Sequence, residues 1–330
     1  MAKKKEAYLS LSAMLRAREP KLLNSDRAER MLDAASFEEA AKLLTDCGYA
    51  DLSQANAKEI EAALTQRRNQ ILDELEQLSP DRAIPDLFRI KYDVHNAKVL
   101  LKAEAMGLEA EELYSRSGRI APEKLREAYR EERWRDLPET FGKALEEARN
   151  TLARTANPQL ADFVLDRAMF AEMLETAKTV DGPFLTNYVR LLLDSTNLKS
   201  LVRTARMHKD ADFLREVLLP GGNADPDRLI AAGDGEGLAS LFAHTPLEQA
   251  AARGAEALSG GNLTAFERAC DDAVTSFLRS AKLVSYGPEA VAAYLAAVEG
   301  EITAVRMILT GRLSGIAPET IRERLRELYA

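Results

Sequence analysis

The apolar residues of this chain recur at spacings of three and four, which is the period of an α-helix. Residues 84–102 are the clearest case, because one stripe of apolar side chains follows this spacing and further apolar residues widen it. Such a wide apolar sector is typical of a helix that packs on more than one side. The stripe is formed by Leu87, Ile90, Val94, Ala97 and Leu101, and Phe88, Tyr92 and Leu100 lie beside it. No stretch alternates with a period of two, so the pattern predicts an all-α protein.

Capping residues and glycines divide the helical pattern into short and long helices. Asn24 and Ser25 open one helix, and Ser36 opens the next with Glu39 three residues on, which is a capping box. Glycines that end helices recur along the chain, some of them followed by proline. These stop signals lie at Gly48, Gly107, Gly118, Gly182, Pro220 to Gly222 and Gly287. The spacing of these signals predicts helices joined by loops and no long linker.

One combination of residues occurs three times at helical spacing: an acid, a small residue three positions later, and a base two positions after that. The copies begin 101 and then 107 residues apart, and each continues into apolar positions. They are Asp93, Asn96 and Lys98; Asp194, Asn197 and Lys199; and Glu301, Ala304 and Arg306.

Other signals recur in step with these copies. A Gly-Pro pair precedes the second and third copies, and a helix that opens with proline follows each copy, at Pro122, Pro226 and Pro318. The sequence therefore predicts three similar helical modules, at residues 1–110, 111–215 and 216–330. A period near 100 residues is too long for a typical solenoid, so we expect the modules to surround a pseudo-threefold axis with a central depression.

The repeated acid, small residue and base allow two interpretations. The acid and the small residue share one helix face, whereas the base lies about 140° away around the helix. In the first interpretation these side chains pair with neighbouring helices and fix the seams between modules. In the second, some of them line the axis and contact a partner. The candidate contacts under either interpretation are Asp93, Asn96, Lys98, Asp194, Asn197, Lys199, Glu301 and Arg306.

Composition narrows the classes of partner. The 45 basic and 53 acidic residues give a net charge of −8, so the chain has no overall electrostatic attraction to nucleic acid or to anionic lipid. Cys47 and Cys270 lie far apart, which favours free thiols in a reducing cytoplasm. No apolar run approaches the ~18 residues of a membrane span, and the N-terminal residues do not resemble a secretory signal.

The sequence predicts no catalytic, cofactor-binding or metal-binding residues. His95, His208 and His244 lack the spacing of metal ligands, and the chain contains no P-loop, dinucleotide or GxSxG motif. An all-helical enzyme of the prenyl-synthase kind would need an Asp-rich metal motif, and Asp271 and Asp272 lack the further acid of that motif. We therefore expect a protein that binds other proteins.

Several segments resemble a known family. Residues 87–107, 186–206 and 294–311 are similar to the signature of the C subunit of the V-type and archaeal-type (A-type) rotary ATPases, a relative of the d subunit of the eukaryotic V-ATPase. The opening residues 8–44 also resemble the start of that family, so the likeness covers essentially the whole chain. Ala304 is a departure, because the first two copies of the repeat carry asparagine at this position.

The resemblance implies a funnel of three helical modules without an active site. The wide mouth would receive the foot of the rotating central shaft, and the base would rest on the membrane ring of ion-carrying subunits. The protein would transmit torque for H⁺ or Na⁺ transport or for ATP synthesis, and would be cytoplasmic and peripheral to the cell membrane. A detachable grip on the shaft would favour polar and charged contacts. The alternative is a helical scaffold of another complex, which would present one continuous concave face.

Overall fold

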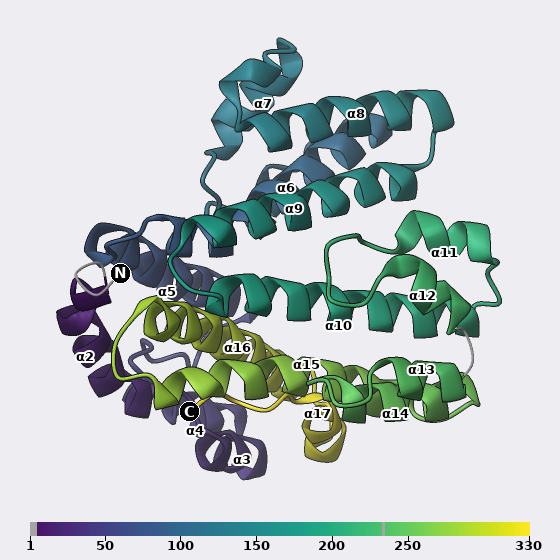
Figure 1. The fold of residues 1–330 in the computed structure, drawn as a ribbon. Helices are drawn as coiled ribbons and strands as arrows, with labels where there is room; N and C mark the ends of the chain where they lie inside the picture. The colour runs from purple at the N-terminus through teal and green to yellow at the C-terminus, as the bar shows by residue number, and fades with distance from the viewer. Residues whose placement is uncertain (1–4, 233–234) are drawn as a thin grey trace.

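The computed structural model describes residues 5–232 and 235–330, and within these ranges the fold is helical throughout, without a β-strand (Figure 1). The predicted all-α class is confirmed. Long helices come in three consecutive pairs: α5 (Ala57–Leu78) with α6 (Ala83–Met106), α9 (Pro158–Thr179) with α10 (Phe184–Arg206), and α15 (Leu263–Arg279) with α16 (Pro288–Leu313).

The remaining helices, of which α8 is as long as α15, connect the pairs and complete the two ends of the chain. They are α2 (Leu9–Arg18), α3 (Ser25–Asp33), α4 (Phe37–Lys42), α7 (Pro122–Arg130), α8 (Glu139–Thr155), α11 (Ala211–Val217), α12 (Pro226–Ala231), α13 (Gly235–Leu241), α14 (Glu248–Leu258) and α17 (Pro318–Arg324). Single 3₁₀ turns lie at η1 (Glu19–Lys21), η2 (Thr45–Cys47), η3 (Glu111–Leu113), η4 (Trp134–Asp136) and η5 (Ser280–Leu283).

Local chemistry sets the ends of the long helices. Asn56 and Glu59 form a reciprocal capping box at the start of α5, because each side chain accepts a hydrogen bond from the backbone N–H of the other residue. Gly107 ends α6 in the left-handed conformation at φ 62°, which glycine adopts without steric cost. Pro288 occupies the first turn of α16, where its missing N–H leaves no helical hydrogen bond unmade.

The second helix of each pair packs along the first helix of the next pair. Thus α6 packs along α9, α10 packs along α15 as well as along α9, and α16 packs along α5. The third of these contacts joins the end of the chain to its beginning. The long helices consequently form a closed circuit of three helix–helix contacts.

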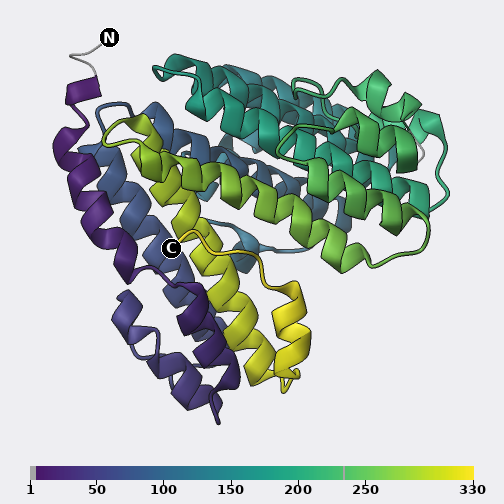
Figure 2. The same ribbon diagram turned by 60° about the horizontal axis from the view of Figure 1, so that its bottom comes forward.

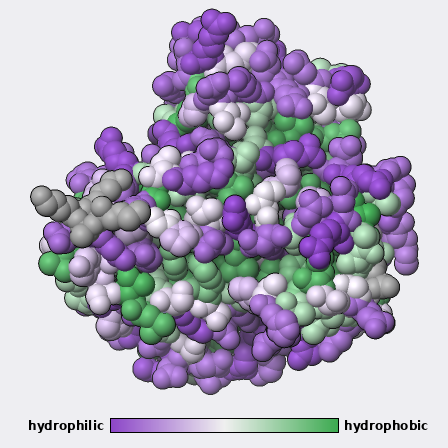
Figure 3. Space-filling view, viewed as in Figure 1, coloured by the Kyte–Doolittle hydropathy of each residue, from purple (hydrophilic) through white to green (hydrophobic). Residues whose placement is uncertain are grey.

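This packing divides the molecule into three lobes, which Figures 1 and 2 show from two sides. The first lobe contains α6 to α9, the second contains α10 to α15, and the third contains α16 and α17 together with α2 to α5. One cluster of buried hydrophobic side chains fills the first lobe, and a larger cluster runs through the second and third lobes. Hydrophilic side chains cover most of the first lobe in Figure 3.

The boundary between two lobes falls at the turn inside a long helix pair, so the two helices of a pair belong to different lobes. The modules predicted at 1–110, 111–215 and 216–330 instead keep both helices of each pair together. Those boundaries, the pseudo-threefold axis and the funnel shape stay predictions. No helix in the described parts of the chain has the length and apolar character needed to cross a bilayer.

Candidate functional site: the seams and the depression between the lobes

The acids of the first two repeat copies bind the backbone of a distant loop. The carboxylate of Asp93 on α6 accepts hydrogen bonds from the backbone N–H of Ile120 at 3.0 Å and from Arg119 Nε at 2.7 Å. Asp194 on α10 accepts one from the backbone N–H of Ala224 at 3.0 Å, with two more from Asn223. Both acids are buried, and each loop leads directly into a helix that opens with proline. Each acid therefore fixes the start of a helix beyond its own.

Glycine permits this close approach in both loops. A Cβ added to Gly118 would overlap Oδ1 of Asp93, and a Cβ added to Gly222 would overlap Oδ1 of Asp194. Both glycines stand two residues before the N–H that the acid binds, at Ile120 and Ala224. They are required by space and not by backbone conformation, since neither has a positive φ.

The third acid closes the circuit at the N-terminal part of the chain. Glu301 on α16 accepts a hydrogen bond from the backbone N–H of Leu23 at 2.7 Å, immediately before α3, and others from the Tyr49 hydroxyl at 2.8 Å and Arg67 Nε at 3.3 Å. Lys21 occupies the position that glycine holds in the other two loops. The glutamate side chain is one methylene longer than aspartate, so the loop need not approach α16 as closely.

The two asparagines of the repeat bind a second point on the same loops. The side-chain amide of Asn96 donates to the carbonyl oxygen of Ser115 at 2.8 Å and accepts from its N–H at 2.7 Å. Asn197 makes the same pair of bonds with Leu219, at 2.7 and 2.8 Å. Ala304 cannot form such bonds, so the third loop is bound through its acid without an asparagine.

The bases of the repeat pair with acids on the next long helix of the circuit, which in each case belongs to the same lobe. Lys98 on α6 binds Asp166 on α9 at 2.6 Å, and Lys199 on α10 binds Asp271 on α15 at 2.8 Å. Arg306 on α16 binds Glu61 on α5 at 2.6 Å. All six side chains are partly exposed, so each pair contributes only about 0.2–1 kcal/mol.

The sequence analysis missed the acidic partners Glu61, Asp166 and Asp271. They follow one another at intervals of 105 residues, which is the repeat period, and this spacing could have revealed them. They were hidden among 53 acids because single acids on helix surfaces carry little information.

Burial shifts the pKa of the three acids of the repeat. It raises the pKa of Asp93, Asp194 and Glu301 above the usual carboxyl values, against the opposing effect of their hydrogen-bond donors. A charged hydrogen bond of this kind contributes about 1.5–3 kcal/mol, and losing one would leave a buried backbone N–H unpaired.

A depression of about 430 Å³ lies where α6, α10, α15 and α16 meet, and the C-terminal segment 325–327 forms part of its wall. Lys91, Leu192 and Glu299 stand at equivalent positions in the three repeats, two residues before the acid, and all three line this depression. The three lobes therefore present corresponding positions of their long helices to one shared space.

Glu299 is the most connected polar group of the depression. Its carboxylate accepts hydrogen bonds from Lys91 Nζ at 2.9 Å, Arg68 Nε at 3.2 Å and the Tyr92 hydroxyl at 2.8 Å. Burial acts to raise the pKa of Glu299, but the charges of Lys91 and Arg68 outweigh it and hold the pKa below the usual value. This cluster joins the third lobe to α6.

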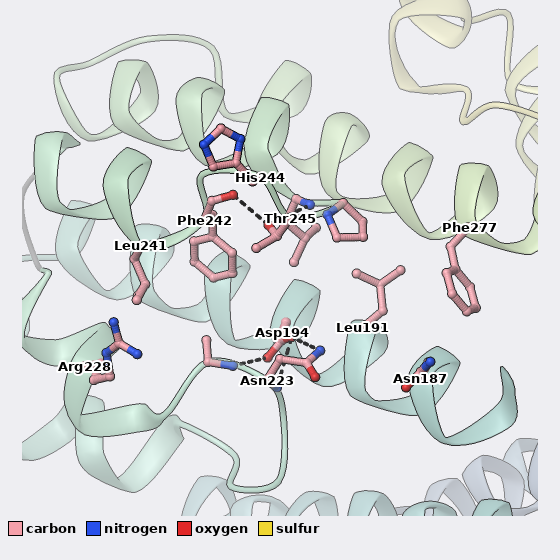
Figure 4. A pocket seen from close by; sticks show the side chains of 13 residues that line it. Asn187, Leu191, Asp194, Asn223, Arg228, Leu241, Phe242, His244, Thr245 and Phe277 are labelled. Atoms are coloured by element: carbon pink, nitrogen blue, oxygen red, sulfur yellow. Dashed lines mark hydrogen bonds between the residues drawn. The ribbon is translucent and has the colours of Figure 1, made fainter. Parts of the chain in front are cut away.

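A second cavity, of about 400 Å³, lies inside the second lobe (Figure 4). Asp194 and Asn223 lie at one side of it, joined by the hydrogen bonds that hold the loop, and Phe242 and Thr245 line the opposite side. This cavity belongs to the packing of one lobe and is not shared between lobes.

Of the eight candidate contacts, Lys199 lines the shared depression, and the structure gives all eight a hydrogen-bond partner in a loop or on a neighbouring helix. Contact of any of them with another chain stays a prediction. Across the described residues, no group of three potential metal ligands comes together.

A closed circuit of helices, with one depression where α6, α10, α15 and α16 meet, defines an all-helical scaffold. Comparison with known proteins identifies the family: the family model for the ATP synthase (C/AC39) subunit matches residues 11–324. The chain belongs to this family, which confirms the resemblance seen in its sequence. It is a structural component of a rotary ATPase and not the catalytic one.

Curated relatives agree over most of the chain. The C subunit of the V-type sodium ATPase of Enterococcus hirae is 26% identical over 325 residues, which cover 98% of this chain and 99% of the relative. The C subunit of the A-type ATP synthase of Methanocaldococcus jannaschii is also 26% identical, covering 96% of this chain and 86% of the relative. The C subunit of the V-type ATP synthase of Thermus thermophilus is 27% identical over 63% of this chain and 67% of its own length.

Proposed function

We propose that this protein is the non-catalytic socket of the central stalk in a V/A-type rotary ATPase, between the rotating shaft of the soluble head and the membrane ring. Its partners would be the central shaft subunits and the ring of ion-carrying subunits. It would couple their rotation for H⁺ or Na⁺ transport or for ATP synthesis. It would act at the cytoplasmic side of the cell membrane, held there through the complex.

The observation that carries this proposal, together with family membership, is the depression shared by the three long helices α6, α10 and α16. A shaft seated there would contact the three lobes at once, so that torque would spread over the whole body. The equivalent positions Lys91, Leu192 and Glu299 make this the natural place for a partner on a common axis.

The buried carboxylates of the repeat support the same role through stiffness within each lobe. Asp93, Asp194 and Glu301 each bind the loop before another helix of their own lobe. Deforming a lobe would have to break these hydrogen bonds in a buried setting, where an unpaired group costs about 1–3 kcal/mol. A body of three stiff lobes can transmit torque without yielding inside one of them.

Affinity purification from the native membranes tests this function. The full chain carries a tag and is recovered in mild detergent, with untagged cells as the control, and the co-purifying proteins are identified. We expect the catalytic head subunits, the central shaft and the ring protein, lost together under harsher washing. Recovery of none of them, from membranes with demonstrable ATPase, would favour a scaffold of another complex instead.

A further inference from the structure

The charged side chains that line the depression are already paired with each other or with near neighbours. Lys91 binds Glu299 at 2.9 Å, and Asp271 binds both Lys199 at 2.8 Å and Arg326 at 2.7 Å through its two oxygens. Glu327, the remaining charged residue of the lining, pairs with Arg279. Lining charges balance, with three bases and three acids.

The hydroxyl groups of the lining are also engaged. Thr196, Thr275 and Thr303 each donate a hydrogen bond to the carbonyl oxygen four residues earlier in their own helix, at 2.8, 3.3 and 2.9 Å. Ser195 donates to the carbonyl oxygen of Cys270 at 3.4 Å. These hydroxyl protons are therefore directed at the protein's own backbone and not at the depression.

Apolar groups make up the rest of the lining. Leu192 comes from α10, Val274 from α15, Ala304 and Met307 from α16, and Leu325 from the C-terminal segment. Ala304, which stands where the other two copies carry asparagine, thus places a methyl group beside this space, whereas the amides of Asn96 and Asn197 bind their loops.

We propose that the depression accepts an uncharged, apolar tip of the partner chain and that ion pairs do not hold the partner there. This inference rests on the proposed function, in which the partner is the shaft. A charged group entering the depression would have to break an existing pair or remain unpaired in a partly desolvated site, and both are unfavourable. The polar and charged grip expected from the resemblance would then lie outside the depression.

Salt dependence of binding tests the chemistry of this contact. The full-length protein is titrated against the purified head complex that carries the shaft, at 50 mM and at 500 mM sodium chloride. Binding through an apolar tip predicts a dissociation constant that changes by no more than about threefold, because screening acts on ion pairs. Moderate ammonium sulfate should tighten the binding, because excluded salts strengthen apolar burial.

Two variants test whether binding of the head complex depends on the depression. Thr303→Lys introduces a charge on an exposed lining position, and Thr155→Lys makes the same change at an exposed position on α8 in the first lobe. Both threonines donate to the carbonyl oxygen four residues earlier, and Thr155 at the end of α8 also accepts a hydrogen bond from the backbone N–H of Asn157 at 3.2 Å, so the control variant loses one bond more than Thr303→Lys. We expect Thr303→Lys to weaken binding at least tenfold and Thr155→Lys to leave it within about twofold.

The outcomes separate this inference from the proposed function. Tight binding that falls steeply with salt, or that Thr303→Lys leaves unchanged, would overturn the apolar tip while the socket would stand. No binding to the head complex at either salt concentration, with a folded protein by circular dichroism, would overturn the socket and the apolar tip together.

Discussion

Single residues in this protein act mainly by fixing loops that are distant in sequence. Asp93, Asp194 and Glu301 each bind the backbone just before another helix, and Asn96 and Asn197 bind a second point on two of those loops. The side chains that looked most like a binding motif in the sequence thus have internal partners. A partner chain that used them would compete with these bonds, unless it bound atoms that remain exposed.

Gly222 offers a direct test of the close approach between loop and acid. In Gly222→Ala the new methyl group would overlap Oδ1 of Asp194, so we expect the free energy of unfolding to fall by about 1–3 kcal/mol. Gly300→Ala is the control, because nothing lies within 4 Å of its added Cβ and it stands inside α16. There alanine should stabilise by about 0.5–1 kcal/mol. Urea unfolding of both variants would measure this, and equal effects would contradict the steric argument.

At the scale of the elements, the order in which the long helices contact one another decides which of their faces are buried. Each long helix is covered on one side by its hairpin neighbour and on the other by the next pair, which explains the wide apolar sector predicted for residues 84–102. At the third seam α16 packs on α5 and holds the loop before α3, so elements from the two ends of the chain depend on each other.

Glu301→Ala tests this dependence between α16 and α3. The change would leave the Leu23 N–H, the Tyr49 hydroxyl and Arg67 without their acceptor, and we expect a loss of about 3–5 kcal/mol of stability. Hydrogen exchange should accelerate at Leu23 and in α3 before it accelerates in α7 of the first lobe. Glu319→Ala, at an exposed position in α17, is the control. Uniform acceleration of exchange in all three lobes would contradict a local seam.

At the scale of the whole molecule, one cluster of polar side chains around Glu299 joins the third lobe to α6 at the depression. Glu299 binds Lys91, Arg68 and Tyr92, so its ionisation affects the contact between lobes and not only one helix. Its depressed pKa means that the folded state stabilises the charged form.

Stability should therefore respond to pH through Glu299. With the pKa lower in the folded chain than the usual 4.5, its contribution is present above pH 4.5 and is lost as pH falls through the folded pKa. We expect Glu299→Gln to be less stable than the wild type at pH 7, with the difference shrinking below pH 4.5. Unfolding midpoints in urea on either side of that pH would measure it. A difference that grows towards acid pH would contradict the assignment.

The sequence by itself determined the class of fold and the repeat. Spacings of three and four, capping residues and glycines predict helices because the backbone's own hydrogen bonds and local sterics act over a few residues. The repeated acid, small residue and base were visible for the same reason, since identical local roles produce identical spacing. The family resemblance followed from the order of these signals over the chain, and residues 11–324 match the family model.

Only the tertiary structure decided what those repeated residues do. Asp93 meets Ile120, Glu301 meets Leu23 and Arg306 meets Glu61, pairs separated by 27 to 278 residues. Such partners depend on how helices pack, and one acid among many on a helix surface does not by itself indicate the base that will face it, although the 105-residue spacing of Glu61, Asp166 and Asp271 becomes informative once the pairs are known. The depression likewise arises where side chains from several helices fail to fill a shared space, which is a property of packing and not of any single segment.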